Sequence, residues 1–341
     1  MPDSSDGSSN SPRDWFNAYD GVRTMVLGAS GFVGRWVARL LSRTGADLLL
    51  GVQDHQRATE IFQQFDVKGR IVALDLNDLT ATADQVSKFQ PAITFNLSGY
   101  GVIPSESDEV IADRINRQLL EIVCERIAAV TTPTWAGQNL VHAGTAFEYG
   151  AIGGNLYEGS TPNPAAVYGI SKLAGSRALM QCSKSLGIRA ITARLFTAYG
   201  PGDEHSGRLL PSLLRATDGD EPLPLTAGTQ KRDFVYVEDV AEGFLRLGTA
   251  VAEPGDIVNL ATGHLHTVRS FVECAAAIAG FPESRLRFGI VPLRREEMMQ
   301  EQDVAVGRLE QLLGWLPRTT VEDGLRMTVE FLRSHRLATN P

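Results

Sequence analysis

The stretch TMVLGASGFVGRWVARLLSR, residues 24–43, decides the fold. Its first four residues predict a buried strand, and the spaced apolar residues at its end predict a helix. Between them, Gly28 permits a tight turn, Gly31 has no Cβ to keep the backbone away from a pyrophosphate, and Gly34 allows close helix packing. The helix N-terminus then offers free N–H groups and a positive dipole end to phosphates. A strand, a glycine turn and a helix in this order predict a dinucleotide-binding unit.

Strand and helix patterns alternate beyond this unit and extend the prediction to the whole chain. Short apolar runs separated by helix-like segments predict an α/β fold with a Rossmann-type, doubly wound parallel sheet. The runs are residues 24–27, 48–52, 71–74, 93–97, 140–142 and 191–195. Proline and glycine interrupt the pattern after Tyr199, so we expect residues 21–198 to form mainly the Rossmann domain. Residues 199–341 are expected to form mainly a smaller C-terminal lobe, with some segments returning to the Rossmann domain. Residues 1–20, rich in Ser, Asp and Asn, are expected to be a disordered tail.

Composition excludes several classes of protein. The 341 residues carry 32 Lys+Arg against 40 Asp+Glu, a net charge of -8, and we find no basic patch for a nucleic acid. No apolar run approaches the roughly 20 residues that span a bilayer, and the polar N-terminus lacks the features of a secretion signal. The three cysteines are far apart, and His264 and His266 stand in a turn without acidic partners, so no metal site is expected. We therefore expect a cytoplasmic protein without nucleic-acid or membrane partners.

The choice between NAD and NADP depends on the residues after the second expected strand. An acid at the end of this strand would hydrogen-bond the adenosine ribose of NAD. The chain has Gln53 at that place, followed by Asp54 and Arg57. Asp54 would serve NAD, whereas Gln53 with Arg57 nearby would tolerate a 2′-phosphate. Both cofactors, and a reading of Asp54 and Arg57 as ordinary loop charges, remain open.

A tyrosine and a lysine in the sequence AAVYGISK are the candidate catalytic pair. Tyr168 and Lys172 lie four residues apart at the start of a helical run, which puts both side chains on one helical face. An adjacent ammonium stabilises a phenolate, so the Tyr168 pKa is expected to fall from about 10 toward working pH. Thr145 follows an expected strand, where its hydroxyl would hold a reacting oxygen beside Tyr168. Together, the three side chains predict proton transfer coupled to hydride transfer.

With these motifs, the chain resembles an extended short-chain dehydrogenase/reductase of the nucleotide-sugar epimerase/dehydratase family. The resemblance covers about residues 23–331 and includes LDLND around Asp75, FNLSG at 95–99 and Asn116. It implies an NAD- or NADP-dependent enzyme with Thr145, Tyr168 and Lys172 as catalytic residues. The implied cofactor-binding residues are Gly28, Gly31, Phe32, Val33, Gly34, Gln53, Asp54, Arg57, Asp75, Leu76, Leu97, Ser98, Gly99, Asn116, Tyr168 and Lys172.

The resemblance also implies that the smaller lobe is a substrate-binding lobe for a nucleotide sugar. The segment RLFTAYGPG at 194–202 resembles the family's RxFNxYGPG, with Thr197 in place of the usual Asn. Arg232 and Arg294 match positions that bind the nucleotide phosphates, and two planar guanidiniums suit a diphosphate. The implied substrate-binding residues are Thr145, Thr197, Arg232 and Arg294. The family commonly dimerises through two helices, here about 109–129 and the helix of Tyr168, so a homodimer is expected.

The residues after Thr145 bear on the reaction. Sugar-nucleotide 4,6-dehydratases resemble one another in carrying Asp-Glu there, whereas this chain has Ala146 and Phe147, which argues against a dehydratase. Glu148 follows, and the sequence does not decide whether it faces the sugar or solvent. The favoured expectation is a sugar-nucleotide 4-epimerase. The alternatives are an NADPH-dependent nucleotide-4-keto-sugar reductase and a cofactor-binding scaffold without catalysis.

Overall fold

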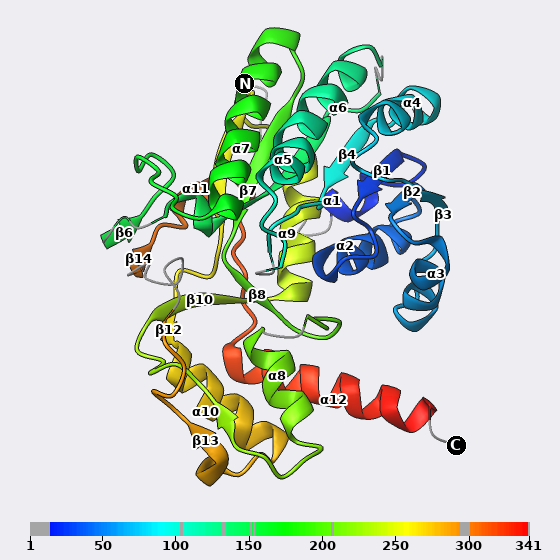
Figure 1. Cartoon of the computed structure of the whole chain (residues 1–341). Coiled ribbons are helices and arrows are strands. Elements are labelled where there is room, and N and C mark those ends of the chain that lie inside the picture. The colour runs from blue at the N-terminus through cyan, green and yellow to red at the C-terminus, as the bar shows by residue number, and fades with distance from the viewer. Residues whose placement is uncertain are drawn as a thin grey trace, which may run out of the picture.

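The computed structural model describes residues 14–102, 105–130, 134–150, 152, 154–205, 208–293 and 301–339. Its centre is a seven-stranded sheet in the order β11-β7-β5-β4-β1-β2-β3 (Figure 1). All of its strand pairs are parallel. The strands are β1 (Arg23–Leu27), β2 (Asp47–Val52), β3 (Arg70–Ala73), β4 (Ile93–Asn96), β5 (Leu140–Thr145), β7 (Ala190–Leu195) and β11 (Asp256–Leu260). The predicted Rossmann-type parallel sheet is confirmed.

Helices cover both faces of this sheet, as a doubly wound fold requires. One face carries α2 (Phe32–Ser42), α3 (His55–Gln64) and α9 (Val237–Thr249), whose apolar side chains join a single core cluster. The opposite face carries α4 (Leu79–Phe89), α6 (Leu119–Ala128) and α7 (Val167–Leu186), which contribute to a second cluster. The strands between them read as continuous apolar runs because both of their faces are buried.

The seventh strand and the helix before it come from the C-terminal part of the sequence. Strand β11 pairs with β7 at the edge of the sheet, and α9 packs against α2. The chain thus enters the smaller lobe after β7, returns to the Rossmann domain with α9 and β11, and then enters the smaller lobe again. The six apolar runs of the sequence did not include β11, because its segment follows the irregular stretch that starts the smaller lobe.

The expectation of a disordered tail over residues 1–20 is wrong for its last part. Residues 14–17 form the short helix α1 (Asp14–Asn17), and Tyr19 is fully buried. The Tyr19 hydroxyl donates a 2.6 Å hydrogen bond to the Leu245 carbonyl oxygen in α9. Trp15, Phe16 and Tyr19 provide enough apolar surface to hold this short segment against the core. The average composition of residues 1–20 conceals this local cluster of aromatic side chains. Residues 1–13 lie outside the described residues.

The helix expected over about 109–129 contains a widened turn. Helix α5 (Glu109–Asp113) runs into the π-helical turn η1 (Arg114–Gln118), which continues into α6. Single π turns of this kind occur frequently at functional sites. Asn116, at the centre of η1, is 1% exposed and faces α7 rather than solvent.

The smaller lobe lies below the sheet in the view of Figure 1 and has its own core. A three-stranded sheet of order β12-β10-β8 connects it to the larger domain, and apolar residues of α8, α10 and α12 pack together beside it. Its elements are β8 (Thr197–Tyr199), α8 (Leu209–Ala216), β9 (Leu223–Pro224), β10 (Lys231–Tyr236), β12 (Leu265–Thr267), α10 (Val268–Ala279), η3 (Glu283–Arg285), β13 (Leu286–Arg287) and α12 (Val321–Thr339). The elements η2 (Ala146–Glu148), β6 (Gly154–Leu156), β14 (Glu301–Val304) and α11 (Gly307–Leu313) complete the described fold. Within the described ranges, every helix is too short or too polar to cross a lipid bilayer.

Candidate active site

The glycine loop between β1 and α2 has the geometry of a phosphate-binding turn. Gly28 has a φ of +75°, a conformation that residues with a Cβ rarely adopt, and a Cβ there would lie 2.9 Å from the Ser98 nitrogen. A Cβ on Gly34 would lie 2.0 Å from the Gly28 carbonyl oxygen, so only glycine fits. A Cβ on Gly31 would instead meet only that same loop oxygen, at 3.2 Å. The exposed side of Gly31 is therefore open to a pyrophosphate at the start of α2, and the loop residues fit a dinucleotide.

Among the residues after β2, Asp54 has a structural role, whereas the side chains of Gln53 and Arg57 are exposed. The Asp54 carboxylate caps α3 by accepting a 3.0 Å hydrogen bond from the Arg57 backbone N–H. Such a cap stabilises the helix start and directs the carboxylate toward α3. Gln53 is exposed just beyond the strand, and Arg57 is exposed in the first turn of α3. Asp54, whose charge would suit a ribose hydroxyl, is thus engaged in capping α3.

The structure brings Thr145 and Tyr168 together. Thr145 ends β5, and Tyr168 lies in the first turn of α7. Partial burial raises the pKa of Tyr168 to about 12, although hydrogen bonding with the Thr145 side chain and the charge of Arg208 oppose this rise. The Phe147 ring lies edge-on to the Tyr168 ring, with 6.1 Å between the ring centres.

Lys172 lies one turn further along α7 and is 2% exposed. Its Nζ donates hydrogen bonds to the carbonyl oxygens of Ser98 at 3.0 Å and Ala143 at 2.9 Å, which fix it behind the ends of β4 and β5. Burial lowers the Lys172 pKa to about 8, and the charge of Glu148 opposes this change. Gly99 contributes room, since a Cβ there would lie 3.3 Å from Nζ.

The expected fall in the Tyr168 pKa is therefore wrong for this structure. The Lys172 ammonium is directed to two backbone carbonyls, and burial of the phenol outweighs the cationic influence of Arg208. Desolvation always favours the neutral phenol, so a lower pKa requires additional positive charge close to its oxygen. The position of Tyr168 agrees with the sequence analysis, but the sign of its pKa shift does not.

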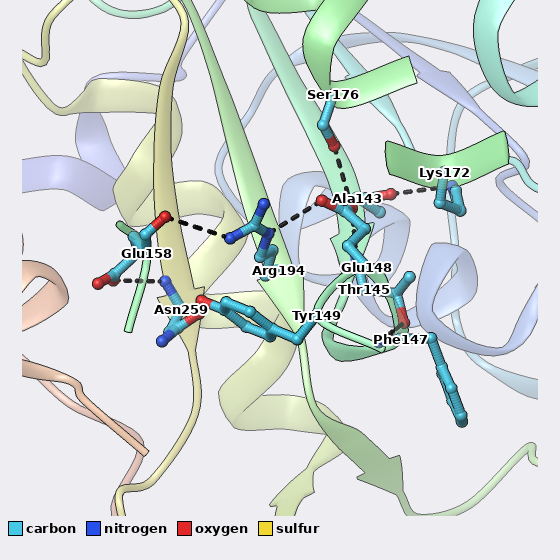
Figure 2. A network of polar contacts seen from close by, with 10 residues as sticks. All are labelled: Ala143, Thr145, Phe147, Glu148, Tyr149, Glu158, Lys172, Ser176, Arg194 and Asn259. Atoms are coloured by element: carbon cyan, nitrogen blue, oxygen red, sulfur yellow. Dashed lines mark hydrogen bonds and ion pairs between the residues drawn. The ribbon is translucent and has the colours of Figure 1, made fainter. Parts of the chain in front are cut away.

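Glu148 faces the protein interior, which answers the question that the sequence left open (Figure 2). One carboxylate oxygen accepts hydrogen bonds from the Thr145 N–H and the Ser176 hydroxyl, both at 3.0 Å. The other accepts a 2.9 Å bond from Arg194 Nε. The guanidinium of Arg194 also lies over the Tyr149 ring, 4.5 Å from its centre. The ion pair between Glu148 and Arg194 thus holds the turn that follows Thr145.

Several of the other residues expected to bind cofactor follow the carboxyl ends of β3 and β4. Asp75 is exposed after β3, where its side chain accepts hydrogen bonds from Asn77, and Leu76 follows it. Leu97, Ser98 and Gly99 follow β4. The amide of Asn116 is committed to the backbone of Tyr100 and the hydroxyl of Ser171, so it connects that loop to α7. Phe32 and Val33 begin α2 directly after Gly31.

Two of the expected substrate residues lie on strands of the three-stranded sheet, which belongs to the smaller lobe. Thr197 starts β8, and Arg232 lies on the neighbouring strand β10 with 7% exposure. Arg232 Nη1 donates to the Lys231 carbonyl oxygen. Arg294 lies outside the described residues. The structure thus locates two of the three lobe positions on adjacent strands.

Sequence analysis missed Arg208. This residue precedes α8, its guanidinium lies over the Phe32 ring at 5.6 Å, and it pairs with the Asp203 carboxylate at 3.1 Å. Its charge lowers the pKa of Tyr168, so Arg208 lies near both Phe32 and Tyr168. The sequence signal that could have identified Arg208 is its position immediately before the apolar helical segment LLPSLL, residues 209–214.

The family model described as "NAD dependent epimerase/dehydratase family" matches residues 24–261. The chain is 30% identical over 321 residues to a dTDP-6-deoxy-L-talose 4-dehydrogenase (NAD(P)(+)) of Kitasatospora kifunensis, covering 89% of this chain and 94% of the relative. It is 26% identical over 345 residues to a UDP-glucose 4-epimerase of Mycolicibacterium smegmatis, covering 92% and 99%.

Solved structures share the fold. An epimerase from Methanothermobacter thermautotrophicus superposes with a TM-score of 0.83 at 19% identity, covering 96% of each chain. The dTDP-glucose 4,6-dehydratase of Streptomyces venezuelae, solved with NAD bound, gives a TM-score of 0.79 at 21% identity, covering 93% of this chain and 98% of that chain.

Proposed function

Since the chain belongs to the NAD-dependent epimerase/dehydratase family, we propose that it transfers hydride at C4 of a nucleotide-linked sugar. The supporting observation is the juxtaposition of Thr145, Tyr168 and Lys172 beside the loop between β1 and α2. When bound, NAD(P) supplies the hydride acceptor or donor. The Gly28–Gly34 loop would hold its pyrophosphate, and the smaller lobe would hold the nucleotide sugar.

Each catalytic side chain has a proposed role that follows from its contacts. The Tyr168 hydroxyl gives a proton to the C4 oxygen during reduction and takes it back during oxidation. The Thr145 hydroxyl, held by the Glu148 turn, hydrogen-bonds the same sugar oxygen and Tyr168. Lys172 provides positive charge behind the site, fixed by Ser98 and Ala143. Arg208 is placed to stabilise negative charge near Tyr168.

We favour a single hydride transfer, that of a 4-keto-sugar reductase or 4-dehydrogenase. Gln53 stands in place of the ribose-binding acid, and Asp54 caps a helix, an arrangement that accepts NADP(H). The relative that is a 4-dehydrogenase using NAD(P)(+) supports this choice. The 4-epimerase favoured by the sequence is the second candidate, supported by the UDP-glucose 4-epimerase relative.

A 4,6-dehydratase fits the site poorly. Elimination of water needs an acid and a base beside the sugar, whereas Ala146 and Phe147 occupy the positions after Thr145. The next carboxylate, Glu148, is fully buried against Arg194 and Ser176. We therefore do not assign it a role in elimination.

Product analysis tests the proposal. UDP-, dTDP-, GDP- and CDP-linked hexoses and their 4-keto forms are incubated with NAD(H) or NADP(H), and products are identified by NMR while nicotinamide absorbance is followed. A reductase consumes one reduced cofactor for each 4-keto sugar and forms the alcohol. An epimerase inverts C4 without net change in cofactor. Absence of C4 chemistry across the panel, with cofactor bound, contradicts the proposed function.

A further inference from the structure

Two cysteines that lie far apart in the sequence come together on neighbouring helices. Cys124 belongs to α6 and is fully buried, whereas Cys182 belongs to α7 and is partly exposed. Cys124 is part of the apolar cluster between these helices and the sheet, and Cys182 packs against that cluster. The Cys124 thiol is hydrogen-bonded to the Cys182 sulfur, and both cysteines are free thiols. The proposed mechanism uses neither side chain.

The packing of the two helices explains this contact. Helices α6 and α7 follow neighbouring parallel strands and lie side by side on one face of the sheet (Figure 1). Their chains approach so closely that a Cβ on Gly175 of α7 would collide with the Asn116 carbonyl oxygen in η1. Cys124 follows Asn116, and Cys182 follows Gly175, by two helical turns, roughly 12 and 11 Å along parallel axes. The two cysteines therefore lie level with each other.

Cys182 has the properties of the more reactive thiol of the pair. The hydrogen bond from Cys124 lowers the pKa of Cys182 to about 7, although burial opposes this change. The thiolate is the form of cysteine that reacts with oxidants, and a small oxidant can reach the partly exposed Cys182 sulfur. In contrast, the hydrogen bond to Cys182 and burial both raise the pKa of Cys124, which is closed to solvent.

We propose that Cys124 and Cys182 form a redox modification site, which hydrogen peroxide converts into a reversible disulfide between α6 and α7. The Cys182 thiolate attacks one peroxide oxygen, so an S–O bond forms, the O–O bond breaks, and hydroxide leaves and is protonated to water. Cys124 then attacks the sulfur of the resulting sulfenic acid. The S–S bond forms, the S–O bond breaks, and the Cys124 proton leaves with the hydroxide as water. Two thiols thus lose two electrons, and the peroxide is reduced to two water molecules.

The disulfide would join two helices that carry parts of the candidate active site. Tyr168 and Lys172 lie in the first turns of α7, and η1, which continues into α6, holds Asn116 against Ser171 of α7. Cys182 lies about 15 Å beyond Lys172 along α7, so oxidation leaves the catalytic side chains unmodified. The bond closes a loop of about 60 residues, which disfavours the unfolded chain and keeps α6 against α7.

Mass spectrometry of the full-length protein tests the proposal. The protein is treated with hydrogen peroxide near neutral pH, the remaining thiols are alkylated, and a digest is analysed without reduction. We expect a cross-linked pair of peptides that contain Cys124 and Cys182, which dithiothreitol separates. The oxidised protein should also migrate as a single chain on a non-reducing gel, because the bond forms within one chain.

Cys274 is the internal control. It is partly exposed like Cys182, but it lies on α10 in the smaller lobe, where burial raises its pKa. Peroxide should therefore protect Cys182 from alkylation about fivefold faster than Cys274, because the larger thiolate fraction of Cys182 outweighs the lower nucleophilicity of a more acidic thiol. In Cys124→Ser, no cross-link should form, and dimedone should trap Cys182 as its sulfenic acid.

Three results would overturn the inference. The first is alkylation of both Cys124 and Cys182 after peroxide treatment has already oxidised Cys274. The second is a cross-link found only between two chains, and the third is a Cys124→Ser protein whose Cys182 gives no dimedone adduct. The measurement on the unaltered protein needs no variant to fold. It also needs no sugar or nicotinamide, so it does not depend on the outcome of the product analysis.

Discussion

Replacing Glu148 with glutamine removes one of the two charges buried behind Thr145. Glu148 is fully buried and Arg194 is 2% exposed, so water cannot compensate for the lost carboxylate. The amide keeps nearly the same size and one acceptor oxygen, so the bonds from Thr145 and Ser176 can persist. Its NH2 group, however, then faces the N–H of Arg194, and the guanidinium loses its counter-ion.

The expected cost follows from this geometry. Breaking a buried ion pair by removing one partner destabilises a protein by about 3–5 kcal/mol, since a charge remains buried and uncompensated. Arg194 keeps its contact with the Tyr149 ring at 4.5 Å and a long bond to the Glu158 carbonyl oxygen at 3.5 Å. These remaining contacts place the expected loss at the lower end, about 3 kcal/mol in the free energy of unfolding.

Urea unfolding near neutral pH, followed by circular dichroism, measures the loss. Glu121→Gln is the control, because Glu121 pairs with Arg117 at the same 2.9 Å but both side chains are more than 30% exposed. Such an exposed pair contributes below about 1 kcal/mol. The reasoning is refuted if the Glu148 variant is destabilised no more than the Glu121 variant. An additional fall in turnover is expected, because Glu148 positions Thr145.

Three further predictions concern the site. Tyr168→Phe should lower turnover by about 10²–10⁴-fold while nicotinamide fluorescence titration shows unchanged cofactor affinity, and normal turnover would reject the acid–base role. The Lys172 pKa of about 8 lies below its ordinary 10.5, so the unfolded chain binds more protons between these values and stability rises with pH there. Compared with Lys172→Met, the unaltered protein should therefore gain about 2 kcal/mol between about pH 7 and 10 in urea unfolding, and a constant difference would contradict this. Gly34→Ala should abolish dinucleotide binding and lower stability by about 1–3 kcal/mol, since its Cβ would lie 2.0 Å from the Gly28 oxygen. Gly307→Ala, where a Cβ meets no atom within 4 Å, should do neither, and equal effects in calorimetry would count against the steric argument.

The parts of the fold that depend on local chemistry were predictable from the sequence. The unit β1–loop–α2 follows from three glycines, and at two of them, Gly28 and Gly34, the geometry leaves no room for a Cβ. The pairing of Tyr168 with Lys172 follows from helical spacing alone. The parallel sheet follows from apolar runs, because strands buried on both faces contain few polar residues.

Features that depend on distant parts of the chain were not predictable. Strand β11 joins the sheet only after the chain has built much of the smaller lobe, and α1 is held by Tyr19 reaching Leu245. Arg208 approaches Tyr168 from α8, which the sequence separates from α7 by two strands. Burial of the phenol, which decides the sign of its pKa shift, likewise comes from tertiary packing rather than from residues 168–172.

The π turn at Arg114–Gln118 gives this protein a point where chain length matters more than side-chain identity. One residue corresponds to about 100° of helical rotation. Deleting a residue here would leave α6 seated between α4 and α7 but would rotate α5 and Asn116 away from Tyr100 and Ser171. A relative shortened by one residue at this place would keep its core and lose the support that Asn116 gives to the loop at Tyr100. Insertions and deletions in η1 therefore offer a route by which function is lost while the scaffold survives.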